Sequence, residues 1–300
     1  MRVLLFGAGG YLGKAIGRAL QGHGHSVAAL ARDADSEARL NAQGIDPVRG
    51  DLDDLAALTR TIKEADGVIF AAAVPFDREW PVASAILEAL KGSGKPFILT
   101  TGTAVLSHET HEGQWREESY AEDDAFTPPP WIATRVATEQ RIRATDGVRA
   151  MIVRPPLIWG LGGSKQIPAI FDSVKKTGAA CYIGAGLNLY THVHVEDLAE
   201  VYCQALVNGK AGALYHAVAG EANWRSLAEA VGAVMGCPAR SVTIDEAKEI
   251  WGDFVGPLFF GVSSRSRSPR TRSELSWQPR HLDVLADVRN GSYRDRYAPS

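Results

Sequence analysis

The first residues of the chain with a clear chemical meaning are three glycines in the segment GAGGYLG, Gly7, Gly10 and Gly13. They follow the apolar run 2–6 and precede the segment 11–20, whose apolar residues recur at helical spacing. Glycine permits a tight turn and a close approach of backbone to ligand, and a helix N-terminus offers free N–H groups and partial positive charge. In this context the GxxGxxG spacing favours a dinucleotide-phosphate site over a tight turn without a ligand, with further contacts from Tyr11 and Leu12.

Arg32 directly follows a second apolar run, residues 26–31, and bears on the choice of cofactor. In a dinucleotide-binding fold, the end of the second strand meets the adenosine ribose, where an acidic residue suits NAD and an arginine suits the extra phosphate of NADP. No Asp or Glu occupies the final strand position, and the planar fork of arginine donors matches a phosphate. We therefore predict NADP in preference to NAD, the alternative being a solvated loop arginine beside Asp33.

Further cofactor contacts are expected just after the third and fourth apolar runs. Asp51 is placed to hydrogen-bond the adenine amino group, with Leu52 beside the ring. Ala71, Ala72 and Ala73 are small enough for the backbone to approach the middle of the cofactor. All of these positions would lie at one edge of a parallel sheet, where its strands end.

Strand-like and helix-like segments alternate through the first half of the chain. The expected strands span residues 2–6, 26–31, 45–51, 66–73, 96–101 and 149–154, and the expected helices span 11–20, 36–43, 52–62, 82–91 and 132–145. This alternation predicts an α/β fold, a Rossmann-type doubly wound parallel sheet with helices on both faces. We expect residues 1–160, with 188–219 contributing, to form an NADP-binding Rossmann domain. Residues 161–187 and 220–300 are then expected to form a smaller C-terminal substrate-binding lobe.

The composition is that of a globular protein without a polyanionic partner. The chain has 300 residues, 45% hydrophobic and 22% charged, with a formal net charge of −3, so we expect neither nucleic acid nor a membrane as a partner. The arginine- and serine-rich segment 263–277 is interpreted as a structured loop leading into a helix rather than as a nucleic-acid-binding tract. Neither a signal peptide nor a membrane-spanning stretch is apparent, and the three cysteines have no metal-binding spacing, so a cytoplasmic location is expected.

Six segments resemble, in their order and spacing, the extended short-chain dehydrogenase/reductases, and more narrowly their NAD-dependent epimerase/dehydratase-like members. They are GAGGYLG, RGDL, LTTGTAV, VRPPLIWG, HVHVEDLA and RSELSWQP, and they extend over nearly the whole chain. The resemblance implies a Rossmann domain for the cofactor and a small C-terminal substrate domain. It also implies a homodimer built from the helices expected at 82–91 and 132–145, and it adds Pro155 to the expected cofactor contacts.

The resemblance further implies a catalytic set that this chain has partly lost. Family members carry a Tyr and, four residues later, a Lys, and a Ser or Thr at the end of the fifth strand completes the set. With Glu139 in the family's usual place, the segment PPPWIATRVATEQ puts Trp131 at the Tyr position and Arg135 at the Lys position. An indole N–H cannot exchange a proton at working pH, whereas Arg135 keeps a charge that could hold the ribose hydroxyls of the cofactor. Thr101 or Thr103 would then serve as the hydroxyl donor.

The segment YTHVHV offers candidates for a substitute proton donor. Tyr190, His192 and His194 lie just before a helix whose expected N-cap is Glu196 or Asp197. Histidine titrates near neutrality and is the obvious replacement acid. The favoured interpretation is nevertheless a structural, partly buried role for these histidines.

The loop after the fifth strand offers other titratable groups, Tyr120, His108 and His111. We interpret Tyr120 as a solvated loop residue. The spacing of SHETHEG matches no helical zinc signature, so no metal is predicted. An aromatic pocket suited to an apolar or planar substrate is expected from four tryptophans, Trp80, Trp115, Trp131 and Trp159.

Three functions remain open from the sequence. The preferred one is an NADP(H)-dependent oxidoreductase that acts on a small carbonyl-type molecule with a nonstandard active site. The second is a non-catalytic NADP(H)-binding sensor or regulatory protein, which the joint loss of Tyr and Lys favours. The third, a nucleotide-sugar epimerase or dehydratase, depends even more on the missing pair. The C-terminal lobe and the strand-end threonines favour the first interpretation.

Overall fold

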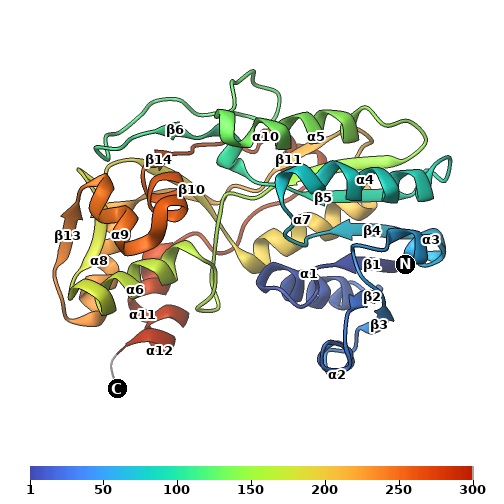
Figure 1. The fold of residues 1–300 in the computed structure, drawn as a ribbon, viewed down its shortest axis with the longest axis horizontal. Helices are drawn as coiled ribbons and strands as arrows, with labels where there is room; N and C mark the ends of the chain where they lie inside the picture. Colours follow the sequence, from blue (N-terminus) through green and yellow to red (C-terminus); the bar gives the residue numbers. More distant parts are fainter. Residues whose placement is uncertain (299–300) are drawn as a thin grey trace.

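The computed structural model describes residues 1–298 and has a seven-stranded parallel sheet at its centre (Figure 1). Its strands are β1 (Arg2–Phe6), β2 (Ser26–Ala31), β3 (Asp46–Arg49), β4 (Gly67–Phe70), β5 (Pro96–Thr100), β7 (Arg149–Arg154) and β11 (Leu214–His216). Their order across the sheet is β11-β7-β5-β4-β1-β2-β3. The strands that follow β1, namely β2 and β3, lie toward one edge of the sheet, and those that follow β4 lie toward the other edge. A ligand-binding crevice is expected at the carboxyl ends of β1 and β4, because the strand order reverses between them.

Helices cover both faces of this sheet, which confirms the predicted Rossmann-type fold (Figure 1). They are α1 (Tyr11–Gly22), α2 (Ala34–Asn41), α3 (Leu55–Glu64), α4 (Phe76–Leu90), α5 (Ala133–Arg143) and α7 (Val195–Asn208). Because successive strand residues point to opposite faces, Val3 and Leu5 of β1 join the core beneath α1 and α7, whereas Leu4 and Phe6 join the core beneath α3 and α4. No helix within residues 1–298 has the length and apolar character required to cross a membrane.

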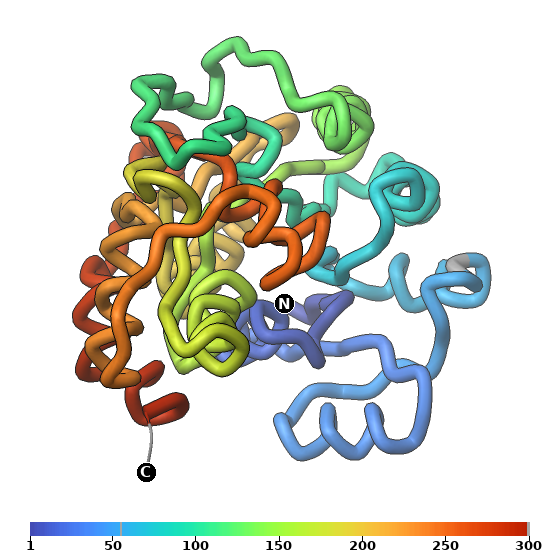
Figure 2. The backbone as a smooth tube through the Cα atoms, turned by 60° about the vertical axis from the view of Figure 1, so that its left-hand side comes forward, coloured from blue at the N-terminus to red at the C-terminus, as the bar shows by residue number. Residues whose placement is uncertain are grey.

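The remaining elements form a smaller unit beside the sheet, on the left in Figure 1. It contains β8 (Leu157–Trp159), β10 (Leu189–His194) and β12 (Gly220–Asn223) in one sheet, and the pair β9 (Ala180–Ile183) and β13 (Ala239–Val242). Around them lie α6 (Gln166–Thr177), α8 (Trp224–Met235), α9 (Ile244–Val255), α11 (Val284–Asn290) and α12 (Ser292–Tyr297). This unit has a hydrophobic core of its own. In Figure 2 its yellow, orange and red segments lie together beside the blue segments of the large sheet.

The starts of α4 and α7 differ from the expectations from sequence in ways that their residues explain. Helix α4 begins at Phe76 rather than at residue 82, because Pro81 lies inside the helix and does not mark its first turn. The predicted N-cap of α7, Glu196 or Asp197, is wrong. Strand β10 runs directly into α7, and His194 caps the helix by accepting the Glu196 N–H at Nδ1 over 3.3 Å.

The arginine- and serine-rich segment is ordered by contacts with the rest of the chain, as predicted. Arg265 pairs with Glu221 at 2.9 Å, and Arg267 pairs with Asp124 at 2.7 Å. The segment continues into α10 (Pro269–Glu274). Shorter elements complete the described part of the chain: β6 (His108–Glu109), β14 (Val262–Ser263), and the helical turns η1 (Thr103–Leu106), η2 (Pro130–Ile132) and η3 (Gly256–Phe260).

Candidate functional site

A cleft of about 440 Å³ opens where β1, β2 and β4 end. Residues from four separate segments line it, which is the arrangement that the strand order favours for a ligand site. Seven of the residues expected from the sequence to contact the cofactor are among them, namely Gly7, Gly10, Arg32, Asp51, Leu52, Ala72 and Ala73. The lining also includes residues that the sequence did not single out, among them Lys14, Ser36 and Arg39.

The glycines of this loop are required by close backbone packing as well as by the cleft. Gly7 adopts φ +92°, and a Cβ atom there would lie 2.7 Å from the backbone of Ala71 and Ala72 at the end of β4. A Cβ atom on Gly13 would overlap the Gly7 carbonyl, with its carbon only 2.6 Å away. The Gly10 amide donates to the Gly7 carbonyl at 3.0 Å, which closes the turn. These glycines therefore let β1, β4 and α1 approach closely enough to form the cleft floor.

Tyr11, Leu12 and Ala71 contact the protein itself rather than the cleft. The Tyr11 hydroxyl donates to the Gly160 carbonyl at 2.7 Å, and burial raises the pKa of this phenol. Leu12 packs against the core between the sheet and α1. The Ala71 amide continues the ladder by donating to Phe6 at 2.9 Å. These three residues support the loops around the crevice.

On the side of the cleft formed by β2 and α2, the lining includes Arg32 and Arg39. The acidic neighbour Asp33 caps α2, because its Oδ1 accepts the Ser36 N–H at 2.7 Å. This backbone hydrogen bond is the main cause of the lowered pKa of Asp33. Among residues 1–298, neither guanidinium group has an assigned hydrogen bond or ion pair, and both residues are exposed. Ser36 and Arg39 are three residues apart on α2 and so share one face, a periodicity that could have identified them from the sequence.

Thr101 and Thr103 do not line the cleft, and backbone hydrogen bonds to the end of β7 and the residue after it hold them in place. The Thr101 amide donates to the Val153 carbonyl at 2.9 Å, and the Thr103 amide donates to the Pro155 carbonyl at 3.0 Å. Both side chains are buried. Within residues 1–298 the Thr101 hydroxyl has no hydrogen-bond partner, whereas Thr103 Oγ1 lies 3.5 Å from the Ser264 hydroxyl. Thr101 thus carries an unused hydroxyl beside the end of the sheet.

Arg135, in the first turn of α5, forms a largely buried ion pair with Glu79 of α4. Its Nε atom lies 3.0 Å from one Glu79 carboxylate oxygen and 3.1 Å from the other. Burial raises the pKa of Glu79, and the guanidinium opposes that rise. The Arg135 guanidinium also lies over the Phe76 ring, 4.4 Å from its centroid. A Cβ atom on Gly102 would be 4.0 Å from Arg135 Nη1, so this cation lies close to the end of β5.

A second buried ion pair fixes the position of α5 relative to β7. Glu139, four residues after Arg135, accepts from Arg154 Nε at 3.0 and 3.1 Å. Both side chains are almost fully buried, with 1% and 4% exposure. Since Arg154 is the last residue of β7, this pair holds the middle of α5 beside the end of that strand.

Trp131 belongs to an aromatic group that differs from the four tryptophans expected. Its ring centroid lies 6.1 Å from that of Phe76 and 5.9 Å from that of Phe254, which is about half exposed. The expected tryptophan pocket is wrong. Trp159 is buried and donates to His192 Nδ1 at 3.1 Å, and Trp115 is exposed beside Arg265. Trp80 lies beneath the Arg141 guanidinium. The sequence lacked a signal for Phe76 and Phe254, because they are 178 positions apart and meet only through Trp131.

The other titratable residues considered from the sequence are held by protein groups. His108 Nε2 lies 2.9 Å from the Tyr120 hydroxyl. His192 is buried, and burial lowers its pKa to about 4. Tyr190 is also buried, which raises the pKa of its phenol. Glu79 is the titratable group that contacts Arg135, and it was not expected from the sequence. The one local indication of its role was an acidic residue among the apolar residues of α4.

The chain is similar to known proteins over its full length. The sequence model of the NAD dependent epimerase/dehydratase family matches residues 3–219. An uncharacterised protein of Schizosaccharomyces pombe is 34% identical over 98% of this chain and 100% of its own length. An uncharacterised protein of Saccharomyces cerevisiae is 33% identical over 96% and 98%. The 2-alkyl-3-oxoalkanoate reductase of Stenotrophomonas maltophilia is 29% identical over 66% of this chain and 63% of its own length.

Solved structures share the fold at low sequence identity. The dTDP-glucose 4,6-dehydratase of Streptomyces venezuelae with NAD bound has a TM-score of 0.78 at 20% identity, covering 99% of this chain and 97% of its own. A human epimerase family protein with NADPH has a TM-score of 0.72 at 18% identity, covering 97% and 99%. Both similarities extend through the C-terminal unit as well as the sheet.

Proposed function

The chain belongs to the NAD dependent epimerase/dehydratase family, and from this premise we propose that it is an NADP(H)-dependent oxidoreductase of a small carbonyl-type compound with a nonstandard active site. The observation that carries the proposal is the cleft at the ends of β1, β2 and β4, with the glycine loop on one side and two unpaired arginines on the other. Relatives named as reductases and solved neighbours named with NAD or NADPH support it.

The charges around the cleft support NADP over NAD. Lys14, Arg32 and Arg39 all line it, and Arg32 and Arg39 can accept an anion without breaking an ion pair. Asp33, the nearest acidic residue after β2, is committed to capping α2. An extra phosphate on the adenosine ribose would therefore lie near the side chains of Arg32 and Arg39 rather than near a free Asp33 carboxylate.

The residues at the strand ends have chemistry suited to holding and orienting. When bound, the nicotinamide cofactor supplies hydride transfer. Arg135 keeps a permanent positive charge near the end of β5, and Glu79 fixes its orientation, so it can hold hydroxyl groups but cannot release a proton. Thr101 carries a hydroxyl that could donate to a carbonyl oxygen after a small local opening. The proton of the reaction would then come from substrate or solvent.

The aromatic group around Trp131 supports an apolar or planar substrate. Trp131, Phe76 and Phe254 bring three ring systems together beside Arg135. Such rings bind flat or apolar surfaces well, and the adjacent cation favours an electron-rich oxygen.

A specific observation favours a second candidate, an NADP(H)-binding sensor without turnover. Arg135 is neutralised by Glu79, and neither Trp131 nor Arg135 can transfer a proton. The cleft is retained in spite of this loss. The third candidate, nucleotide-sugar epimerisation or dehydration, has less support, because it places greater demands on the two replaced residues.

The test is turnover with a broad substrate panel. Purified protein is mixed with NADPH and with aldehydes, ketones, enones and imines, and the cofactor absorbance is followed. We expect oxidation of NADPH with at least one apolar carbonyl compound. Tight binding of NADPH without turnover across the panel would replace this proposal with the sensor, and absence of binding would refute both.

The double variant Trp131→Tyr and Arg135→Lys tests the assignment of the site independently. It restores the Tyr and Lys that the family uses, and we expect it to create or raise carbonyl reduction. The matched control is Trp115→Tyr, since Trp115 is exposed and remote from Arg135. An unchanged rate in the double variant, with folding and NADPH binding intact, would show that α5 does not carry the reaction.

A further inference from the structure

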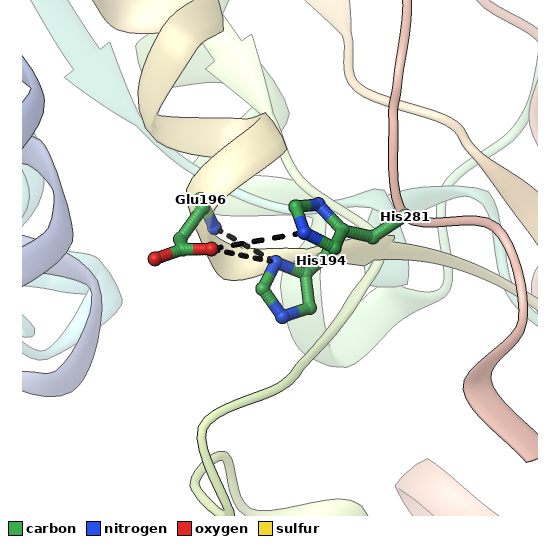
Figure 3. A group of neighbouring side chains, drawn as sticks. All are labelled: His194, Glu196 and His281. Carbon is green, nitrogen blue, oxygen red and sulfur yellow. Dashed lines mark hydrogen bonds and ion pairs between the residues drawn. The ribbon is translucent and has the colours of Figure 1, made fainter. Parts of the chain in front are cut away.

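Three side chains with metal-binding atoms converge where α7 begins. His194 and Glu196 come from the end of β10 and the start of α7, and His281 comes from the segment between α10 and α11 (Figure 3). Their candidate ligand atoms all lie within 4.8 Å of one another. Among residues 1–298 this is the one group of three or more such side chains that meets this distance. The sequence did not suggest it, because His281 is 85 positions beyond Glu196.

The tautomer of His281 leaves a lone pair facing Glu196. His281 Nδ1 lies 3.1 Å from Asp197 Oδ1, and a carboxylate can only accept there, so Nδ1 carries the hydrogen. In the neutral ring Nε2 is then the nitrogen without hydrogen, and it lies 3.8 Å from Glu196 Oε2. The Asp197 carboxylate is buried and is also held by the backbone N–H groups of Arg280 and His281 at 2.9 and 2.8 Å. A histidine ligand whose other nitrogen donates to a fixed carboxylate is the usual arrangement around protein-bound metals.

The tautomer of His194 places a second unprotonated nitrogen beside Glu196. Its Nδ1 accepts the Glu196 N–H over 3.3 Å, so Nδ1 carries no hydrogen, and an ion bound there would replace this long hydrogen bond. The same Nδ1 lies 3.8 Å from Glu196 Oε2. The two imidazole rings stack with centroids 4.0 Å apart, which holds both lone pairs on the side where the carboxylate lies (Figure 3).

The spacing of these atoms suits an ion rather than direct hydrogen bonds. Both nitrogen–oxygen separations, 3.8 Å, are too long for a hydrogen bond. Tetrahedral ligands bound to zinc at about 2.0–2.2 Å are roughly 3.4 Å apart, so each gap would need to close by only a few tenths of an ångström. Glu196 is more than half exposed and is free to make this movement.

We propose that His194, Glu196 and His281 form a structural binding site for a divalent ion of the zinc class, with water as the fourth ligand. Two imidazoles and one carboxylate are ligands of the type that zinc accepts, whereas calcium and magnesium prefer oxygen ligands alone. The ion would join the start of α7, which packs against α1 and the large sheet, to the segment that leads into α11 of the smaller unit. Its binding would therefore stabilise the junction between the two units.

The site is separate from the proposed cofactor cleft. None of its three residues lines that cleft. The inference therefore does not depend on the proposed function, and metal binding can be measured without turnover.

The experiment uses the full-length protein freed of metal by a chelator and then titrated with Zn²⁺ in a calorimeter. We expect one ion per chain and a rise in Tm on binding. Co²⁺, as a spectroscopic probe, should give the visible absorption of a four-coordinate site. His281→Ala and Glu196→Gln should each weaken Zn²⁺ binding by about tenfold or more, since each removes a ligand. The far-UV circular dichroism spectrum of both variants should match that of the unaltered protein and reports that they are folded.

The matched control is His111→Ala. His111 is exposed to a similar degree as His281 and also has a nearby carboxylate, Glu109 at 3.9 Å, but no third ligand within residues 1–298. It should bind Zn²⁺ as the unaltered protein does. The proposal is overturned if the unaltered protein takes up no Zn²⁺, or if both site variants retain its affinity and stoichiometry. If His281→Ala fails to fold, Glu196→Gln decides alone, since this side chain is 55% exposed and glutamine keeps its size.

Discussion

Replacing Arg32 by alanine should change the preference between NADPH and NADH without disturbing the fold. Arg32 lies at the end of β2, lines the cleft and is exposed. Within residues 1–298 it has no hydrogen bond or ion pair to lose, so the unliganded protein should keep its stability. The loss should appear only when a ligand carries the phosphate that Arg32 addresses.

The magnitude follows from the exposure of the site. A hydrogen bond to a charged group contributes roughly 1.5–3 kcal/mol, and the lower end applies to a solvated arginine. Because about 1.4 kcal/mol corresponds to a factor of ten, Arg32→Ala should weaken NADPH binding about tenfold. Arg39→Ala should act in the same direction. The double variant should lose less than the product of the two effects, because both side chains would address one phosphate.

The assay is fluorescence or calorimetric titration of each variant with NADPH and, separately, with NADH. NADH affinity should stay unchanged, which distinguishes a contact with the 2′-phosphate from a contact with the pyrophosphate. Arg49→Ala is the matched control, since Arg49 follows closely on the next strand but pairs with Glu37 at 2.6 Å and does not line the cleft. Equal losses for NADPH and NADH, or no loss for either, would refute the assignment of Arg32.

Three further outcomes test the packing around the site. Gly13→Ala should lower Tm and abolish NADPH binding, because its Cβ would overlap the Gly7 carbonyl. The control Gly9→Ala should leave Tm unchanged, because nothing lies within 4 Å of its Cβ. Similar Tm values for the two variants would contradict this account. Glu139→Ala should cost about 3–5 kcal/mol in urea unfolding, because it leaves the buried Arg154 charge unpaired, and a cost below about 1 kcal/mol would show that the pair is solvated. His216 is fully buried, and burial lowers its pKa to about 3, so the unfolded chain binds a proton that the folded protein rejects. The contribution of neutral His216 to the free energy of unfolding is complete above the unfolded pKa of about 6.5. It is lost as pH falls, by about 2 kcal/mol at pH 5. Unfolding free energies at pH 8 and pH 5 should therefore differ by less in His216→Asn than in the unaltered protein, and equal differences would rule out this group.

The cofactor half of the molecule could be predicted well because its signals are local. The alternation of apolar strands and amphipathic helices, and the glycines between β1 and α1, each occupy one short segment. Strand order and the position of the crevice then follow from general rules of connection in parallel sheets. The position of Arg32 at the end of a strand could be predicted in the same way, because it directly follows the apolar run of β2.

The region around Trp131 was less predictable because its contacts are not local. The sequence could identify Trp131 and Arg135 by their place in a motif, but it did not indicate that Glu79 neutralises Arg135. It also grouped the wrong aromatic residues, because aromatic content does not specify which rings converge. Phe254 lies near the end of α9 and contacts Trp131 only because the C-terminal unit brings this helix beside it.

The sequence by itself determined the fold class and the glycine loop, since each depends on residue types at short, fixed spacings. The tertiary structure alone decided which side chains meet: Glu79 with Arg135, and His281 with His194 and Glu196. Each of these contacts joins segments at least 56 positions apart. Their partners are selected by the packing of whole helices and strands, and residue spacing along the chain does not record that packing.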